Sequence, residues 1–263
     1  ADPNSLISDT VFCVMIDHNG KPWIGTSKGL EAFDNKTNKF IHIQNKIDDK
    51  PVDIRPAVFE VYEDKKGIIW FSTGNPIDGL PSDFDGLNRL DPATGKQSFY
   101  KSDPVDPGSL INREISAIFE DSRGNLWVGT KGNGLHTLDR NTGKFTRHLY
   151  DPSLPGKLSR PPISKTDSTD AICFIQEDHT GKIWIGSFEK GINWYDPATK
   201  QTWHFGLSSD KKNRPPFEKD TLTGFKDDAP VRFLIAADST TWITGSSGNI
   251  YTVSYGRKTI PYY

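Results

Sequence analysis

The sequence predicts an all-β fold built from one unit that occurs five times, and three observations support this prediction. A short motif of an Asp, a Gly and a Trp recurs along the chain, with the Gly missing from its last copy. The residues before each Asp are rich in β-branched and aromatic side chains, which is typical of strands. No segment has a sustained helical periodicity, so we expect little helix. The motif occupies residues Asp17–Thr26, Asp64–Thr73, Asp121–Thr130, Asp178–Ser187 and, shortened, Asp238–Gly245.

The motif predicts a hairpin made of the first two strands of each unit. The Gly after the Asp can adopt a positive φ and reverse the chain, so the Trp segment returns as the second strand. We interpret each Trp as a core residue that anchors this strand. First strands are predicted at Val11–Ile16, Val58–Tyr62, Ile115–Phe119, Ile172–Ile175 and Val231–Ala236, and the core tryptophans are Trp23, Trp70, Trp127, Trp184 and Trp242.

Two further strands complete each unit. A Gly and an apolar residue introduce the third strand, and a turn rich in Asp, Asn, Thr and Lys leads to the fourth. Four antiparallel strands that repeat every 50 to 60 residues, roughly, are the blade of a β-propeller, which is the fold we predict. Third strands are expected at Gly29–Phe33, Gly86–Leu90, Gly134–Leu138, Gly191–Tyr195 and Gly248–Val253, and fourth strands include Phe145–Tyr150, Thr202–Phe205 and Lys258–Tyr263.

We expect a single propeller domain over residues 1–263, with blades at approximately 1–50, 51–105, 106–160, 161–220 and 221–263. The five blades either close by packing alone or form part of a larger propeller whose other blades lie outside this chain. Cys13 and Cys173 fall in the first strands of the first and fourth units, which closure would not place side by side. We therefore expect two buried free thiols.

Composition excludes two classes of partner. The 263 residues include 32 Lys and Arg and 34 Asp and Glu, interspersed, with a formal charge of -2. There is no basic stripe for a nucleic acid and no polybasic tract for a membrane surface. No apolar segment approaches the length of about 18 residues that spans a bilayer. We expect neither nucleic acid binding nor membrane contact by this segment.

The stretch Phe119–Phe145 resembles the two-component regulator propeller repeat, as does the lead-in Asp106–Leu110, which is echoed by Asp2–Leu6. The resemblance covers all five units and is weakest in the fifth. It implies the periplasmic or extracellular sensor part of a hybrid two-component histidine kinase, where such repeats detect oligosaccharides. It also implies a longer parent protein and leaves open dimerisation through that parent. The chain itself lacks kinase motifs, so we do not expect it to be an enzyme.

Loop lengths indicate which face binds a ligand. In an up-and-down blade, the first-to-second and third-to-fourth turns share one face, and these turns are short and uniform. The second-to-third loops and the connections between blades share the other face. Long and varied loops on a rigid scaffold usually carry function, so we expect the binding site there. The long segments are residues 43–55, 73–86, 102–113, 151–170 and 206–230.

Charged residues of both signs mark this face, where the first strands begin around the central opening. Arg side chains match carboxylates, so a polar or uronate-bearing oligosaccharide would suit them. Alternatively, these charges pair with one another and cap the channel. Aromatic residues could stack on sugars, although burial between blades also explains Trp194 and Trp203. The candidate ligand-binding residues are Asp9, Arg55, Arg113, Glu114, Asp170, Arg232, Lys28, Lys131, Glu189 and Phe188, with Asp83 and Phe84 beside them.

Evidence for chemistry is weak in the sequence. The six His residues show no metal-ligand spacing, and the calcium-like segment Asp83–Gly86 lacks a third ligand and a distal Glu, so we expect no metal and no cofactor. Two alternatives to a sensor remain. One is a structural or protein-interaction propeller that docks another chain. The other is a propeller glycosidase or polysaccharide lyase, which would need either a cluster of Arg, His and Tyr or a pair of carboxylates from among Asp9, Glu114, Asp170 and Glu189.

Overall fold

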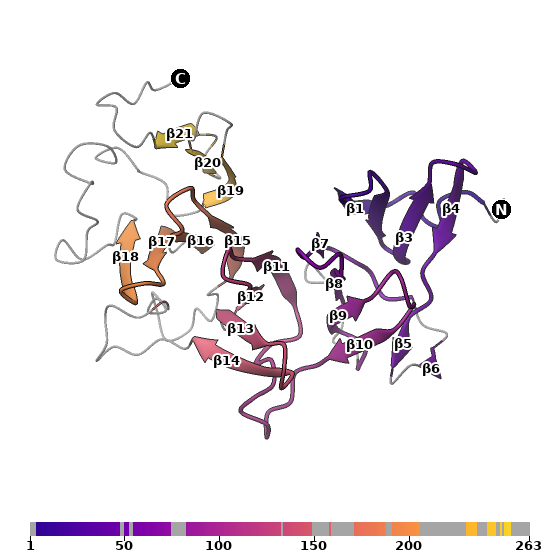
Figure 1. The fold of residues 1–263 in the computed structure, drawn as a ribbon, viewed down its shortest axis with the longest axis horizontal. Coiled ribbons are helices and arrows are strands. Elements are labelled where there is room, and N and C mark those ends of the chain that lie inside the picture. The colour runs from indigo at the N-terminus through magenta and orange to yellow at the C-terminus, as the bar shows by residue number, and fades with distance from the viewer. Residues whose placement is uncertain are drawn as a thin grey trace. The chain divides into compact units, whose positions relative to one another are not determined.

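The computed structural model describes residues 4–47, 50–52, 55–74, 83–132, 134–148, 158, 171–187, 191–205, 230–235, 241–245, 248 and 250–253. Every regular element in these ranges is a β-strand (Figure 1), which confirms the predicted all-β class. Within them, no helix is long and apolar enough to cross a membrane.

Apart from a two-stranded sheet, the described strands form five sheets of three or four strands in which each strand pairs with the next one along the chain. This sequential order confirms the predicted blades, and the fourth strand expected at Lys258–Tyr263 lies outside the described residues. The first sheet comprises β1 (Val11–Ile16), β2 (Pro22–Thr26), β3 (Gly29–Asp34) and β4 (Lys39–His42), and the second comprises β7 (Val61–Glu63), β8 (Ile69–Thr73), β9 (Gly86–Leu90) and β10 (Gln97–Tyr100). The third comprises β11 (Ile115–Glu120), β12 (Leu126–Thr130), β13 (Leu135–Asp139) and β14 (Lys144–His148), and the fourth comprises β15 (Ile172–Glu177), β16 (Ile183–Ser187), β17 (Gly191–Asp196) and β18 (Gln201–Phe205). The fifth comprises the described strands β19 (Pro230–Ile235), β20 (Thr241–Gly245) and β21 (Ile250–Val253).

Two local features of the second sheet differ from the prediction. The first strand begins at Val61 rather than Val58, because the backbone N–H groups of Phe59 and Glu60 donate to Ser72 Oγ at 3.2 and 3.0 Å instead of joining the ladder. A short hairpin of β5 (Lys46–Ile47) and β6 (Lys50–Pro51) also lies in the connection before this sheet, and nothing in the sequence pattern indicated it.

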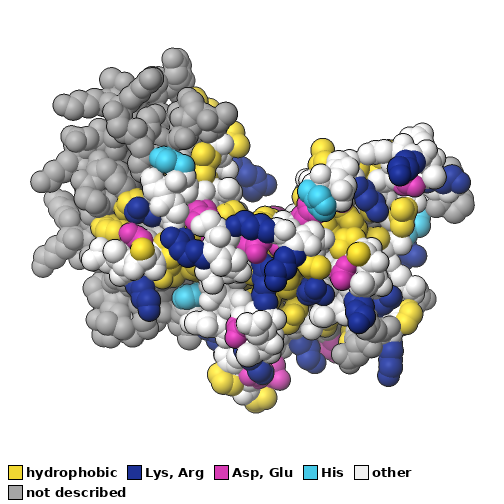
Figure 2. Space-filling view, in the orientation of Figure 1, with side chains coloured by type: hydrophobic (Ala, Val, Ile, Leu, Met, Phe, Trp, Pro, Cys, Tyr) yellow, Lys and Arg dark blue, Asp and Glu magenta, His cyan; other side chains and the backbone are white. Residues whose placement is uncertain are grey.

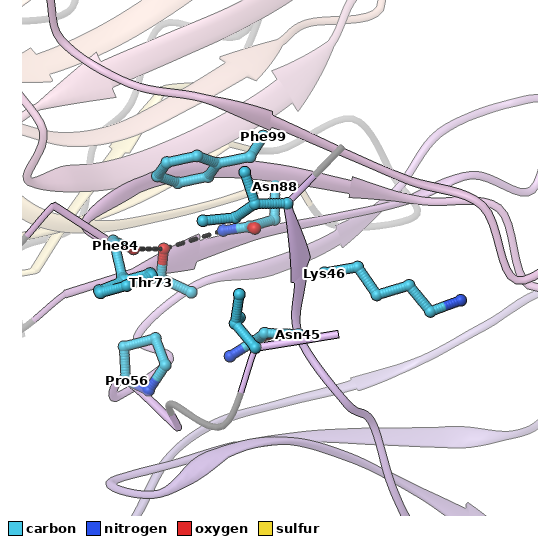
Figure 3. A pocket seen from close by; sticks show the side chains of 9 residues that line it. Asn45, Lys46, Pro56, Thr73, Phe84, Asn88 and Phe99 are labelled. Carbon is cyan, nitrogen blue, oxygen red and sulfur yellow. Dashed lines mark hydrogen bonds between the residues drawn. The ribbon is translucent and has the colours of Figure 1, made fainter. Parts of the chain in front are cut away.

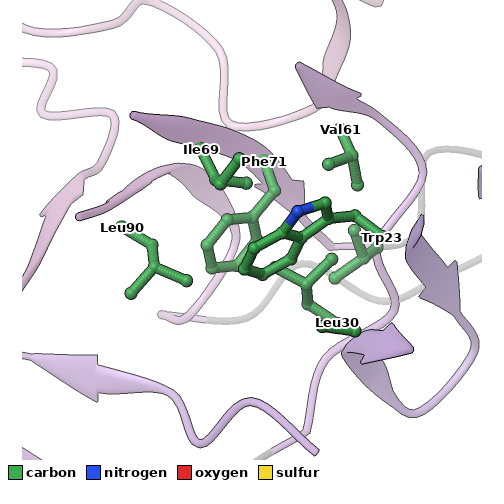
Figure 4. Close-up of a cluster of buried hydrophobic side chains, with 8 residues drawn as sticks. Trp23, Leu30, Val61, Ile69, Phe71 and Leu90 are labelled. Atoms are coloured by element: carbon green, nitrogen blue, oxygen red, sulfur yellow. The ribbon is translucent and has the colours of Figure 1, made fainter. Parts of the chain in front are cut away.

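The chain divides into two compact units, residues 1–120 with 138–147 and residues 121–137 with 148–263. In the first unit, Trp23 and Leu30 of the first sheet pack against Val61, Ile69 and Phe71 of the second (Figure 4). All five side chains are buried. The packing of the Trp strand onto the following sheet therefore forms the core of this unit, as expected for adjacent blades.

The second unit has an equivalent core. Trp184 and Trp194 pack with Phe174 and Ile243, and Phe233 of the next sheet stacks on Phe174 with ring centroids 5.0 Å apart. Trp194 is buried and Trp203 is partly buried against the same cluster, which favours the packing role over sugar stacking for both residues.

The predicted core position of Trp242 is wrong, because 38% of this side chain is exposed. Trp184 points to the face of its sheet that Phe233 of the next sheet covers, at a centroid distance of 5.3 Å. Ile243, the next residue of β20, is instead buried against the fourth sheet.

The two cysteines are free, as predicted. Burial of Cys13, reinforced by the negative charge of Glu60, raises the pKa of this thiol to about 12. Cys13 is therefore protonated at neutral pH and acts as a small packing residue.

Candidate ligand-binding site

The repeated Asp residues belong to the hairpins. Asp17 Oδ1 accepts hydrogen bonds from the backbone N–H groups of Asn19 and Lys21, both at 2.9 Å, and Oδ2 accepts one from Trp23 Nε1 at 3.0 Å. The same Trp bond recurs for Asp64, Asp121 and Asp178, at 2.8, 2.9 and 2.8 Å to Trp70, Trp127 and Trp184. These carboxylates stabilise the hairpin turns, so we assign them a structural role rather than a role in ligand binding.

The hydrogen bonds also determine the charge state of this Asp. Desolvation of the Asp17 carboxyl tends to raise its pKa, but the bonds from Trp23, Lys21 and Asn19 together outweigh it, and the pKa is lowered. Asp17 therefore remains ionised throughout the physiological pH range.

A pocket lies at the opposite end of the second sheet, where Thr73 of β8 pairs with Gly86 of β9 (Figure 3). Two segments form its walls: the connection that precedes the second sheet and the strands and loop of that sheet. Both belong to the long-loop face predicted to bind a ligand. The lining residues are Asn45, Lys46, Ile47, Val52, Pro56, Thr73, Phe84, Asn88 and Phe99.

Hydrogen bonds fix the polar wall of this pocket. Thr73 Oγ1 donates to the carbonyl oxygen of Phe84 at 2.6 Å and accepts a bond from Asn88 Nδ2 at 2.8 Å, both drawn in Figure 3. Asn45 and Asn88 are buried. The Asn88 amide and the Thr73 hydroxyl are therefore held in place before any ligand arrives, which reduces the entropy lost on binding.

The second wall is anchored to β10. The backbone N–H of Lys46 donates to Gln97 Oε1 at 2.9 Å, and Gln97 Nε2 donates to the carbonyl oxygen of Gln44 at 2.7 Å. Lys46 Nζ donates to the carbonyl oxygen of Gly95 at 3.0 Å and points away from the pocket in Figure 3. The pocket is consequently lined by apolar side chains and neutral polar groups.

Three of the predicted ligand-binding residues gather at the same end of the first sheet. Ser8 and Ser27 share a hydrogen bond of 2.7 Å between their hydroxyls, and Asp9 and Lys28 are the residues that follow them in the sequence. A Cβ atom placed on Gly29 would lie 3.8 Å from Cβ of Arg55. Asp9, Lys28 and Arg55 are all exposed, and Arg55 precedes the pocket residue Pro56.

The other predicted residues lie on separate elements of the two units or outside the described residues. Arg113 and Glu114 are half-buried in the turn before β11, where the Glu114 N–H donates to Asn112 Oδ1 at 2.9 Å. Lys131 and Arg232 are exposed and belong to the second unit. Asp170, Phe188 and Glu189 lie outside the described residues.

Charges of both signs are interspersed on the face shown in Figure 2, with no continuous field of one sign among the described residues. Asp83 is exposed, and Phe84 lines the pocket. No group of three or more His, Cys, Asp or Glu side chains that could hold a metal ion occurs within the described ranges.

Sequence reasoning missed the polar pocket residues Asn45 and Asn88. A signal for Asn88 exists, because in each of the first four sheets the residue two positions after the Gly that introduces the third strand is a buried polar residue within an apolar segment. These residues are Glu31, Asn88, His136 and Asn193. In the first sheet, Glu31 Oε1 accepts the backbone N–H of Ile7 at 2.8 Å, so this position fastens the segment that leads into the sheet.

Comparison with known proteins supports the predicted resemblance. Residues 109–132 match the family described as two component regulator propeller. No curated protein sequence matches the chain.

Solved structures share the fold. An extracellular domain described as part of a hybrid two component system from B. thetaiotaomicron is 24% identical, with a TM-score of 0.68 over 97% of this chain and 30% of that chain. An extracellular domain of a one component system from B. thetaiotaomicron is 21% identical, with a TM-score of 0.63 over 97% and 31%. Virginiamycin B lyase from Staphylococcus aureus is 15% identical, with a TM-score of 0.62 over 98% and 72%. At these identities the likeness establishes the propeller fold.

Proposed function

We propose that this chain is a ligand-binding sensor module that recognises an oligosaccharide on its long-loop face and provides the input of a two-component signalling system. The observation that carries this proposal is the preformed neutral pocket among the long loops of the second sheet, where the exposed Arg55 directly precedes the lining residue Pro56. Sugar-binding sites combine apolar or aromatic walls with a few well-placed hydrogen-bonding groups. Phe84 and Phe99 provide the former, and Asn45 and Asn88 the latter.

The setting of this module follows from its relatives. Two of the similar structures are described as extracellular domains of bacterial signalling systems, and the chain spans 30% and 31% of their lengths. We therefore place the module in the periplasm or outside the cell, as one part of a longer sensor. A membrane segment, a kinase and dimerisation would be properties of that longer protein.

Thermal unfolding across a panel of oligosaccharides, neutral and uronate-bearing, tests the proposal. A ligand present at a hundred times its dissociation constant stabilises the folded chain by about 2.7 kcal/mol, which raises the unfolding midpoint by roughly 5 to 10 °C. We expect a shift with at least one ligand and intact ligand afterwards by mass spectrometry. Cleavage of the ligand would instead indicate a glycosidase or lyase, and the absence of any shift would contradict oligosaccharide binding.

A further inference from the structure

We propose that the pocket of the second sheet receives the acetamido group of an N-acetylated sugar residue, with the methyl group inside and the rest of the oligosaccharide across the loop face. This inference rests on the proposed function and specifies its ligand. It comes from three properties of the pocket, namely its size, its lining and its lack of charge.

Size limits what can enter. The pocket encloses about 220 Å³ including its open mouth, and its interior has room for about one water-sized group. Whole ligands usually occupy pockets of about 300 to 1,000 Å³. A substituent of methyl size therefore fits, whereas an entire sugar ring has to remain outside.

The lining selects an apolar group next to an amide. Ile47, Val52, Pro56 and the two phenylalanines supply an apolar wall that a hydroxyl group would enter only at the cost of its hydrogen bonds to water. The carboxamide of Asn45 lies at the same wall. A carboxamide has both donor and acceptor atoms, which complement the C=O and N–H of an acetamido group.

The lack of a charged group facing the pocket interior argues against the entry of a uronate or a protonated amino sugar. Lys46 Nζ is bound to the Gly95 carbonyl and directed away from the pocket, so no cationic head group faces the interior from the lining residues. A uronate or a protonated amino sugar would lose its hydration there without a compensating partner. The exposed Arg55 and Lys28 would meet such charges outside the pocket, on the adjoining surface.

Titration calorimetry on the complete chain with matched tetrasaccharides tests the inference. The probes are the β-1,4 tetramers of N-acetylglucosamine, N-propionylglucosamine and glucose. We expect the N-acetyl tetramer to bind at least tenfold more tightly than the glucose tetramer, and the N-propionyl tetramer to lose most of that advantage because its extra methylene exceeds the space. Equal affinities for the three would overturn the inference.

A filled-pocket variant provides a second test. Val52→Phe places additional volume in the pocket, and its matched control Ile41→Phe makes the same kind of enlargement at an exposed position of β4 in the same unit. We expect V52F to lose at least tenfold in affinity for the N-acetyl tetramer, while I41F binds like the original chain. Unfolding midpoints of both variants verify that they fold. Undiminished binding by V52F would contradict the assignment of this pocket.

The panel separates the two proposals. If the N-acetyl tetramer does not bind but a neutral or uronate-bearing oligosaccharide without acetamido groups does, the inference about the pocket fails and the sensor function stands. If no oligosaccharide of either kind binds, the sensor function itself fails.

Discussion

At the scale of single residues, the aspartate of each hairpin does more than terminate a strand. Asp121 is fully buried and accepts hydrogen bonds from the N–H groups of Arg123 and Asn125, from Asn125 Nδ2 and from Trp127 Nε1, at 2.8 to 3.0 Å. The sequence motif therefore encodes a link between a turn and a core side chain. This link explains why the Asp and the Trp recur together.

Replacing Asp121 by Ala should lower the free energy of unfolding by about 3 kcal/mol, because several buried donors lose a charged acceptor. Urea denaturation followed by tryptophan fluorescence measures the loss. Asp139→Ala is the control, since Asp139 is exposed at the end of β13 and accepts hydrogen bonds from Asn141 and Thr142 of the following turn, not from a buried Trp. Similar losses in both variants would show that the bond to Trp127 is unimportant.

Protonation of His18 makes the stability of the folded chain depend on pH, and the direction of this dependence follows from its pKa. Its hydrogen bond to Glu63, together with the negative charge of Glu63, raises the pKa of His18 above its ordinary value of about 6.5. The folded state thus binds the proton more tightly than the unfolded state, so this contribution to stability is complete below pH 6.5, approximately, and is lost as pH rises through the folded-state pKa.

We therefore predict that NMR titration gives His18 a pKa above that of an unperturbed histidine, and that Glu63→Gln returns it towards that value. The unfolding midpoint of the original chain should fall more between pH 6 and 8 than that of E63Q. A His18 pKa that is unchanged by E63Q would refute this link.

At the scale of elements, adjacent sheets are fastened by a second repeated carboxylate. Glu63, Glu120 and Glu177 each precede the hairpin Asp, and each accepts the backbone N–H of a residue in the turn of the preceding sheet. The donors are His18, Lys65 and Ser122. The first and fifth repeats have Ile16 and Ala237 at this position. The dipeptide Glu-Asp is thus a sequence marker for a turn that is held from the next sheet.

Arg140 reinforces this junction within the first unit. Its guanidinium contacts Asp64 Oδ2 at 2.9 Å and Glu120 Oε1 at 3.0 Å, and it lies over the Trp70 ring, with only 19% of the side chain exposed. Removing the cation would leave two buried carboxylates facing each other. The junction therefore depends on this one side chain more than on either acid.

Arg140→Met should lower the free energy of unfolding by about 3 kcal/mol, because breaking a buried ion pair leaves uncompensated charges. Arg123→Met is the matched control: Arg123 pairs with Glu177 at 3.3 Å but is 42% exposed, so its loss should cost less than about 1 kcal/mol. Both values come from urea denaturation at low salt. Equal costs for the two variants would contradict a special role for the buried junction.

At the scale of the whole molecule, the sequence predicts the blades but not the pocket. Strand order and the Trp anchors follow from local periodicity and turn chemistry, which neighbouring residues determine. The pocket depends on Asn45 and Asn88, which meet only after the connection folds back onto the second sheet. The core prediction for Trp242 is wrong for the same reason, because the burial of a repeat Trp depends on contact with the following sheet and not on its own strand.

The exposed Arg55, which precedes the pocket residue Pro56, leads to a prediction about the proposed ligand-binding surface. Arg55 is exposed beside Gly29, so it can meet a carboxylate of a bound chain without losing much hydration. Arg55→Ala should therefore weaken a uronate-bearing oligosaccharide by about tenfold, equivalent to about 1.4 kcal/mol, and hardly affect a neutral one. The difference should shrink at high salt, because exposed charges are screened.

Calorimetry at about 50 mM and about 500 mM salt measures this effect, conditions that span strong and weak screening. Lys36→Ala is the control, since Lys36 is an exposed cation in the turn between β3 and β4, at the other end of the first sheet. An equal loss for neutral and acidic ligands would mean that Arg55 shapes the surface rather than recognising charge. An equal loss of affinity for the acidic ligand in both variants would show that the net charge of the chain, and not a subsite on the long-loop face, determines the binding of acidic ligands.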